Sequence, residues 1–148
     1  MQDDAVKENR QAMRLYIVLT RTYKALLDKD LHNIRSYGLN ATEFGVLEFL
    51  YNKGSHPLQK IGDHILITSG SITYVVDKLE SKGLIVRRAC SKDRRIIYAE
   101  LTEAGQSKMS EILPNHYKAL AEALKGLNPA EKEQTIELLK KINFYSQE

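Results

Sequence analysis

Short hydroxyl side chains gather between positions 68 and 73, and a group of lysines and arginines follows them in the sequence. Serine and threonine hydroxyls can reach base edges and phosphates in the major groove of DNA, and the positive end of a helix favours the phosphate backbone. A helix that is only solvated more often carries glutamate and lysine on this face. The segment is therefore expected to be a DNA-recognition helix. Its DNA-facing residues would be Thr68, Ser69, Ser71, Thr73, Tyr74 and Lys78.

The basic residues that follow are concentrated in one short stretch. The net charge of the whole chain is only +3, which says little about partners. Between positions 82 and 95, however, six lysines or arginines stand against a single aspartate, Asp93. They are Lys82, Arg87, Arg88, Lys92, Arg94 and Arg95. Such a patch is typical of a surface that binds phosphate groups. The alternative is a solvated, charged turn, which the recognition helix directly before it disfavours.

The elements that would position these groups follow from the periodicity of the sequence. Thr68 can cap a helix, and apolar residues then recur at i, i+3, i+4 and i+7, so that one stripe faces inward. The stripe consists of Ile72, Val75, Val76 and Leu79. Gly83 would close the helix, and strands at 84–86 and 96–101 would pair across the basic turn. Helix, tight stop and hairpin in this order predict a winged helix-turn-helix.

Three further helices are predicted before the recognition helix. A long one covers about residues 4–37, since its apolar residues recur at intervals of three and four. A second begins after Asn40, whose side chain can form a capping box with Glu43. After an extended link at 56–57, a brief helix over about 58–65 would form the helix-turn-helix pair with the recognition helix.

Two helices are predicted after the wing. Thr102 can cap a long one that contains Pro114, and Gly126 is expected to end it. Asn128 and Glu131 can form a capping box for the last helix. The inward stripe of that helix would be Ile136, Leu139 and Ile142.

The first helix and the last two each keep an apolar stripe with no obvious partner in so short a chain. We expect these stripes to be buried against a second copy, because symmetric dimers are the commonest oligomers and match two-fold DNA sites. The alternative is an intramolecular helix bundle.

The length of 148 residues and the 43% apolar content fit a single domain that is large enough to bury a hydrophobic core. No apolar run is long enough to span a membrane, and the N-terminus opens with acidic residues rather than as a signal peptide. A cytoplasmic protein is therefore expected. The single cysteine, Cys90, excludes an intramolecular disulfide framework and is compatible with a reducing compartment.

With these elements in place, the chain resembles the MarR family of winged-helix transcription regulators. The family's Asp-x-Arg wing motif is present at 93–95, and Leu-Thr-Glu-Ala-Gly follows it at 101–105 with the family's spacing. The opening of the second helix at 39–44 also matches, although Asn40 stands where the family more often has threonine or serine. In that family the arginine of the wing tip enters the minor groove and the aspartate pairs with an arginine. The resemblance transfers these roles to Arg95 and Asp93.

The resemblance implies a fold that is mainly α with a small β-hairpin, in one MarR-like domain over 1–148. Long dimerisation helices would lie at about 1–37 and 103–148, and a winged helix-turn-helix lobe at about 39–101. The stretches 68–80 and 37–40 are also similar to the hydroquinone-responsive branch of the family, whose members repress genes that detoxify quinones and related aromatic compounds.

No cofactor, metal or catalytic function is expected. The four histidines show none of the i, i+4 pairings of a helical zinc site. The sequence has no nucleophile elbow, P-loop or dinucleotide-binding fingerprint, so enzymatic activity is not predicted.

A pocket for a small aromatic effector is expected where the dimer helices meet the DNA-binding lobe, since an apolar cavity with a few polar tips suits a phenolic ligand. The aromatic candidates are Tyr16, Tyr23, His32, Tyr37, Phe44 and Tyr117. The alternative for each is ordinary core packing.

The sequence thus predicts a homodimeric regulator that binds operator DNA, and it favours a repressor that a small aromatic compound releases. One alternative is redox sensing through Cys90, because Arg88 and Lys92 are close in sequence and neighbouring cations favour the thiolate. Against it, comparable thiol-sensing members of the family carry their cysteine in the first helix, which has none here. A second alternative is a winged helix used for protein association without DNA, which would not need a basic wing tip.

Overall fold

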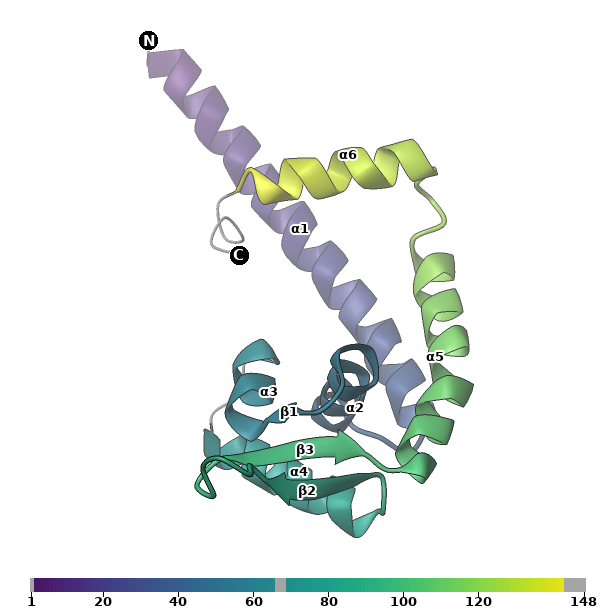
Figure 1. Ribbon diagram of the computed structural model, residues 1–148. Helices are drawn as coiled ribbons and strands as arrows, with labels where there is room; N and C mark the ends of the chain where they lie inside the picture. The colour runs from purple at the N-terminus through teal and green to yellow at the C-terminus, as the bar shows by residue number, and fades with distance from the viewer. Residues whose placement is uncertain (1, 66–68, 143–148) are drawn as a thin grey trace.

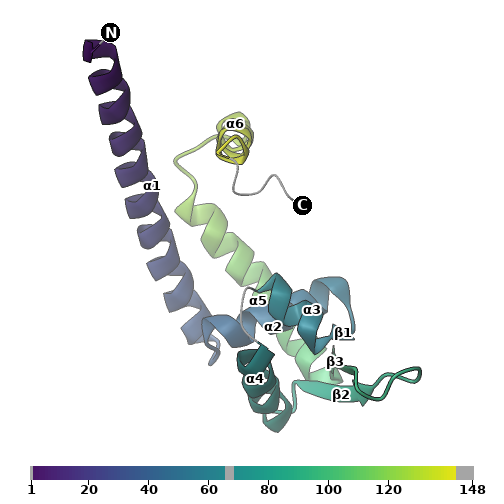
Figure 2. The ribbon, with the colours of Figure 1, turned by 90° about the vertical axis from the view of Figure 1, so that its left-hand side faces the viewer.

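The computed structural model describes residues 2–65 and 69–142 (Figure 1). A lobe of short helices and a small sheet lies at one end, and two long helices lead away from it (Figures 1 and 2). The elements are α1 (Gln2–Ser36), α2 (Ala41–Lys53), β1 (His56–Pro57), α3 (Leu58–His64), α4 (Ser69–Ser81), β2 (Ile85–Ala89), β3 (Ile97–Leu101), α5 (Glu103–Ala123) and α6 (Pro129–Lys140).

The predicted helix caps are present. Asn40 Oδ1 accepts a hydrogen bond from Glu43 N at 2.8 Å, and Glu43 Oε2 accepts one from Asn40 N at 3.1 Å, so that two otherwise unpaired donors at the start of α2 are satisfied. Asn128 and Glu131 repeat this capping box at the start of α6. Thr102 Oγ1 caps α5 by accepting from a backbone N–H in its first turn. The prediction of these three helix starts is confirmed.

The sheet has three antiparallel strands in the order β1-β3-β2. The hairpin of β2 and β3 is the predicted wing, with Ile85 opposite Leu101 and Ala89 opposite Ile97. The segment at 56–57, expected only as an extended link, pairs with β3 as a short edge strand. Proline lacks an N–H and is tolerated at an edge, where no further strand requires that donor. The strand went unpredicted because two residues show no alternation.

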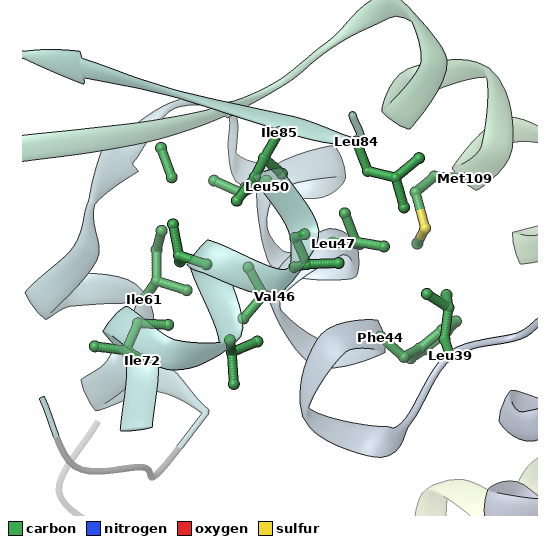
Figure 3. Close-up of a cluster of buried hydrophobic side chains, with 14 of the residues drawn as sticks. Leu39, Phe44, Val46, Leu47, Leu50, Ile61, Ile72, Leu84, Ile85 and Met109 are labelled. Atoms are coloured by element: carbon green, nitrogen blue, oxygen red, sulfur yellow. The ribbon is translucent and has the colours of Figure 1, made fainter. Parts of the chain in front are cut away.

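The hydrophobic core lies between α2, α3, α4, the sheet and the start of α5 (Figure 3). All four residues of the predicted inward stripe of α4 are buried. Gly105 of α5 lies against Leu84, in the turn between α4 and β2, where an added Cβ would be 2.0 Å from Leu84 O. Thr102 strengthens the same junction, since its N–H donates to Leu84 O and its hydroxyl to Gly83 O. Glycine in the 101–105 motif therefore permits the close packing of α5 on the wing.

Two predictions about helix ends are not confirmed. The prediction that Gly126 ends the fifth helix is wrong, because α5 ends at Ala123 and Leu124 N donates to Leu120 O and Ala121 O. This ending is right-handed, with φ of −106° at Leu124, so it requires no glycine. The predicted cap at Thr68 and the turn at 66–67 lie outside the described residues.

Apolar side chains remain exposed on α1 and α6. Exposed residues on α1 include Met13, Tyr16, Ile17 and Tyr23. On α6 the predicted stripe continues past the helix end, and Ile136, Leu139 and Ile142 are 44%, 41% and 41% exposed. No residue of α6 is buried, and Figure 2 shows this helix standing apart from α1. The alternative of an intramolecular bundle is therefore wrong for α6. No helix in the described ranges is long and apolar enough to cross a membrane.

Candidate nucleic-acid interface

The predicted recognition helix, α4, and the wing lie at the same end of the molecule, away from the N-terminus and α6 (Figures 1 and 2). The buried stripe of α4 faces the core, and its opposite face carries Ser71, Thr73, Tyr74 and Lys78, all exposed. Ser69 is the first residue of α4, and Thr68 lies outside the described residues. Because the core holds α4 by one side only, its polar side remains available to a ligand as large as DNA.

Tyr74 and Lys78 act as a pair on this polar face. Lys78 Nζ lies 5.2 Å from the centre of the Tyr74 ring, one helical turn away. The hydrogen bond with Tyr74 raises the pKa of Lys78 above its usual value. The lysine is therefore fully charged at neutral pH, and its position is tied to an aromatic ring.

The six predicted basic residues divide into two groups. Three of them, Lys82, Arg87 and Arg88, are paired with carboxylates of neighbouring elements. Lys82 Nζ lies 3.0 Å from both carboxylate oxygens of Glu43 in α2. Arg88 on β2 pairs with Glu100 on β3. These cations hold elements of the lobe together, so whether they also contact phosphate remains a prediction.

Arg87 has the largest set of partners. Its guanidinium lies 2.9 Å from Glu80 Oε1 and 2.5 Å from Asp77 Oδ1, and it also donates to the Thr73 carbonyl at 3.3 Å. Its backbone N–H donates to Glu80 Oε2. All of these partners belong to α4, so Arg87 fastens the recognition helix to strand β2.

The remaining three, Lys92, Arg94 and Arg95, lie in the exposed wing turn. Arg95 forms a two-point pair with Asp93, with Nη2 3.0 Å from Oδ2 and Nε 3.1 Å from Oδ1. The hydrogen bonds with Arg95 lower the pKa of Asp93 below its usual value, and the bond with Asp93 raises the pKa of Arg95. Lys92 and Arg94 form no ion pair with the part of the chain that the structure describes.

The Asp93–Arg95 ion pair shows how the family's wing motif is arranged in this chain. The family pattern implies two roles: a groove-entering arginine at Arg95, and an arginine partner for Asp93. In the structure these are one arginine, and its side chain is 91% exposed. The aspartate thus orients a guanidinium that can still reach outward.

The sequence matches known proteins over most of its length. Residues 39–97 match the MarR family model. The chain is 46% identical over 134 residues to the HTH-type transcriptional regulator MhqR of Bacillus subtilis, a match that covers 90% of this chain and 92% of that protein. This protein belongs to the MarR family. The identification from the sequence motifs is confirmed, and the protein is a transcriptional regulator rather than an enzyme.

Two further relatives place this MarR-family protein more broadly. It is 30% identical over 132 residues to the transcriptional repressor MprA of Escherichia coli, with 85% of this chain and 75% of MprA covered. Its structure resembles that of BpsR of Bordetella bronchiseptica, whose DNA binding is regulated by 6-hydroxynicotinic acid. That match has a TM-score of 0.75 and 26% identity, and covers 87% of this chain and 98% of BpsR.

The aromatic candidates for an effector pocket in this MarR-family chain are dispersed. His32 lines a cavity of about 610 Å³ between α1 and α5, which Asn33, Ala119 and Glu122 also line. Tyr16 and Tyr23 are exposed on α1, whereas Phe44 belongs to the hydrophobic core. Tyr37 packs against the core, and Tyr117 Oη lies 3.5 Å from Glu48 Oε1. Of the six aromatic candidates, His32 alone lines the cavity between α1 and α5 of one chain.

His116 has no role predicted from the sequence, yet it occupies the junction of three helices. It is buried, its ring lies 4.5 Å from that of Phe44, and its Nδ1 is 3.1 Å from Asn33 Oδ1. The junction joins α5, α2 and α1 next to the cavity. Its position four residues after the buried Ile112 was the available sequence signal.

Cys90 follows the last residue of β2, where the wing turn begins. It is half-buried, and its N–H donates to Ile96 O at 2.9 Å. No group of three or more metal-ligating side chains occurs within the described ranges.

Proposed function

We propose that this MarR-family regulator is a homodimeric repressor that binds operator DNA and is released by a small aromatic compound. The observation that carries the DNA-binding part is that α4, with its exposed hydroxyl side chains, lies at the same end of the molecule as the wing turn with Lys92, Arg94 and Arg95. A helix in the major groove reads base edges, and a basic wing contributes salt-dependent attraction to phosphates.

Dimerisation is supported by the exposed apolar residues of α1 and α6. Apolar side chains such as Leu139 and Ile142 are energetically costly to expose, and both remain 41% exposed in the described chain. Against a second copy, the same residues would form a symmetric interface. Two recognition helices would then meet half-sites about one helical turn apart, roughly 34–36 Å.

Repression and release by an effector are supported by the relatives. MprA is a repressor, and the DNA binding of BpsR responds to an aromatic acid. The similarity to MhqR agrees with the resemblance to the hydroquinone-responsive branch, which makes phenols and quinones the first compounds to test. The cavity beside His32 is a candidate site, since it lies between the proposed dimer helices and close to the His116 junction.

One experiment tests the proposal in two steps. Genomic DNA fragments retained by the purified protein would first be sequenced to find the operator, and the complex would then be exposed to a panel of phenols and quinones. We expect one or a few related palindromic sites, and release by at least one compound. Retention of DNA without sequence preference, or no retention at all, would contradict operator binding.

A further inference from the structure

The carboxylate of Glu43 is the most deeply buried charged group of the DNA-binding lobe. The residue is only 4% exposed, and its two oxygens receive hydrogen bonds from Asn40 N and from Lys82 Nζ. Glutamate is rarely buried unless it is paired, because loss of hydration must be compensated by partners. Of these partners, the Asn40 N–H is local to the helix start, whereas Lys82 lies 39 residues away in sequence.

Lys82 lies at the C-terminal end of the recognition helix. It directly follows α4, and its N–H donates to Lys78 O at 3.1 Å, so it continues the last turn of that helix. Its ammonium group leans toward α2, and its side chain is 40% exposed. The pair therefore joins the first turn of α2 to the last turn of α4.

The same turn of α2 also contacts the long helices. Phe44, next to Glu43, packs its ring against His116 of α5, which in turn contacts Asn33 of α1. One turn of α2 is thus in contact with α5 through Phe44 and with the end of the recognition helix through Glu43.

We propose that Glu43 is a positioning residue for operator recognition, which acts through Lys82 to set the orientation of α4 relative to α2. Arg87 fastens α4 to the sheet through Asp77 and Glu80, and the Glu43–Lys82 pair adds an ion pair between α4 and a second neighbour, α2. Lys82 is then a structural cation rather than a phosphate contact. The proposal rests on the operator binding proposed above.

The two roles of Lys82 predict different measurements. A phosphate contact contributes to every duplex, and its removal lowers the log-log salt slope by about one. A positioning pair contributes to the fit of α4 in the major groove, so its removal lowers operator affinity while nonspecific affinity and salt slope stay the same. Since the pair acts as a unit, removing either partner should have the effect of removing both.

The test compares Glu43→Gln, Lys82→Gln and the double variant in titrations against operator and scrambled duplex at several salt concentrations. Glutamine at position 43 keeps an oxygen that can accept from Asn40 N, so the capping box can persist. We expect each single variant and the double variant to lose operator affinity by a similar factor, about tenfold, with scrambled-duplex affinity within about twofold of the parent. Lys82→Arg, which retains the charge, should lose much less.

Glu48→Gln, a second carboxylate of α2, is the matched control and should bind both duplexes like the parent. Thermal unfolding of every variant reports whether the lobe still folds. If Glu43→Gln does not fold, the comparison of Lys82→Gln with the parent still tests the proposal. Equal losses on both duplexes, a salt slope lowered by about one in Lys82→Gln, or unchanged operator affinity in Glu43→Gln would each overturn the proposal. A parent protein that bound no duplex would instead refute operator binding itself.

Discussion

Asp93 holds Arg95 across the wing turn by a two-point ion pair, and the backbone N–H of Arg95 also donates to Asp93 Oδ1 at 3.0 Å. These three hydrogen bonds join residues only two positions apart, so they fix the conformation of the turn before DNA is bound. The guanidinium is restricted in direction but remains exposed to solvent. Such a restriction lowers the entropy that the side chain would lose when it enters a groove.

We therefore expect Arg95→Ala to weaken binding to operator and scrambled duplex together. The salt dependence should flatten by about one unit of log-log slope for each arginine removed from the DNA, because fewer counterions are released. Arg88→Ala is the matched control, since Arg88 is already paired with Glu100, and it should change the slope less. If Arg95→Ala left both affinities and the slope unchanged, the wing would not be a DNA element and protein association would gain support.

The same pair predicts a pH dependence of the wing. Arg95 lowers the pKa of Asp93 from its ordinary value of 3.8, so the pair stabilises the folded turn above that pH. This stabilisation is lost as the pH falls through the lower, folded pKa. An NMR titration of the Asp93 carboxyl group should give a midpoint below 3.8 in the parent and a higher midpoint in Arg95→Ala. Equal midpoints in the two proteins would show that the pair does not form in solution.

Ser71 and Thr73 on the recognition helix should affect specificity rather than overall affinity. If they face base edges, Ser71→Ala and Thr73→Ala lose discrimination of about 1–3 kcal/mol at one or two base pairs. Affinity for scrambled duplex should stay close to that of the parent. Competition among operators with single base-pair changes measures the effect. Ser107→Ala, an exposed hydroxyl on α5, serves as the control, and uniform weakening across all sequences would contradict base reading.

Dimerisation should depend on the apolar stripe of α6. Leu139→Glu places a charge in the proposed interface, where burial without a partner is costly, so the dimer should dissociate. Gln134→Glu adds the same charge on the other side of the helix and should leave the assembly intact. Sedimentation at micromolar concentration is expected to give twice 16.9 kDa for the parent and the control. A parent that sediments only at 16.9 kDa would disprove the dimer.

Cys90 tests the choice between a pocket and a thiol as the sensor. If the pocket senses the compound, Cys90→Ser should change neither operator affinity nor release by a non-electrophilic phenol. Ser91→Ala is the neighbouring control for any effect of altering the wing turn. Loss of the response to every inducer in Cys90→Ser alone would replace the pocket with covalent sensing at the thiol.

The elements of this fold that local chemistry specifies were predictable from the sequence. The Asn40–Glu43 and Asn128–Glu131 boxes depend on residues three positions apart, and the inward stripe of α4 depends only on helical periodicity. Family membership followed from the order and spacing of such motifs. The wing was predictable for the same reason: Gly83 ends the helix before it, and the two paired strands are close to each other in sequence.

The partners of the charged residues were decided only by the tertiary structure. Counted along the sequence, Lys82, Arg87 and Arg88 belong to one basic patch with Arg95. In the fold, Lys82 meets Glu43 across 39 residues and Arg87 meets the side of α4. The pairing of His56 and Pro57 with β3 and the His116 junction likewise join distant segments. The physical reason is that a cap or a stripe is set by backbone geometry within one or two turns, whereas an ion pair depends on which elements the core brings together.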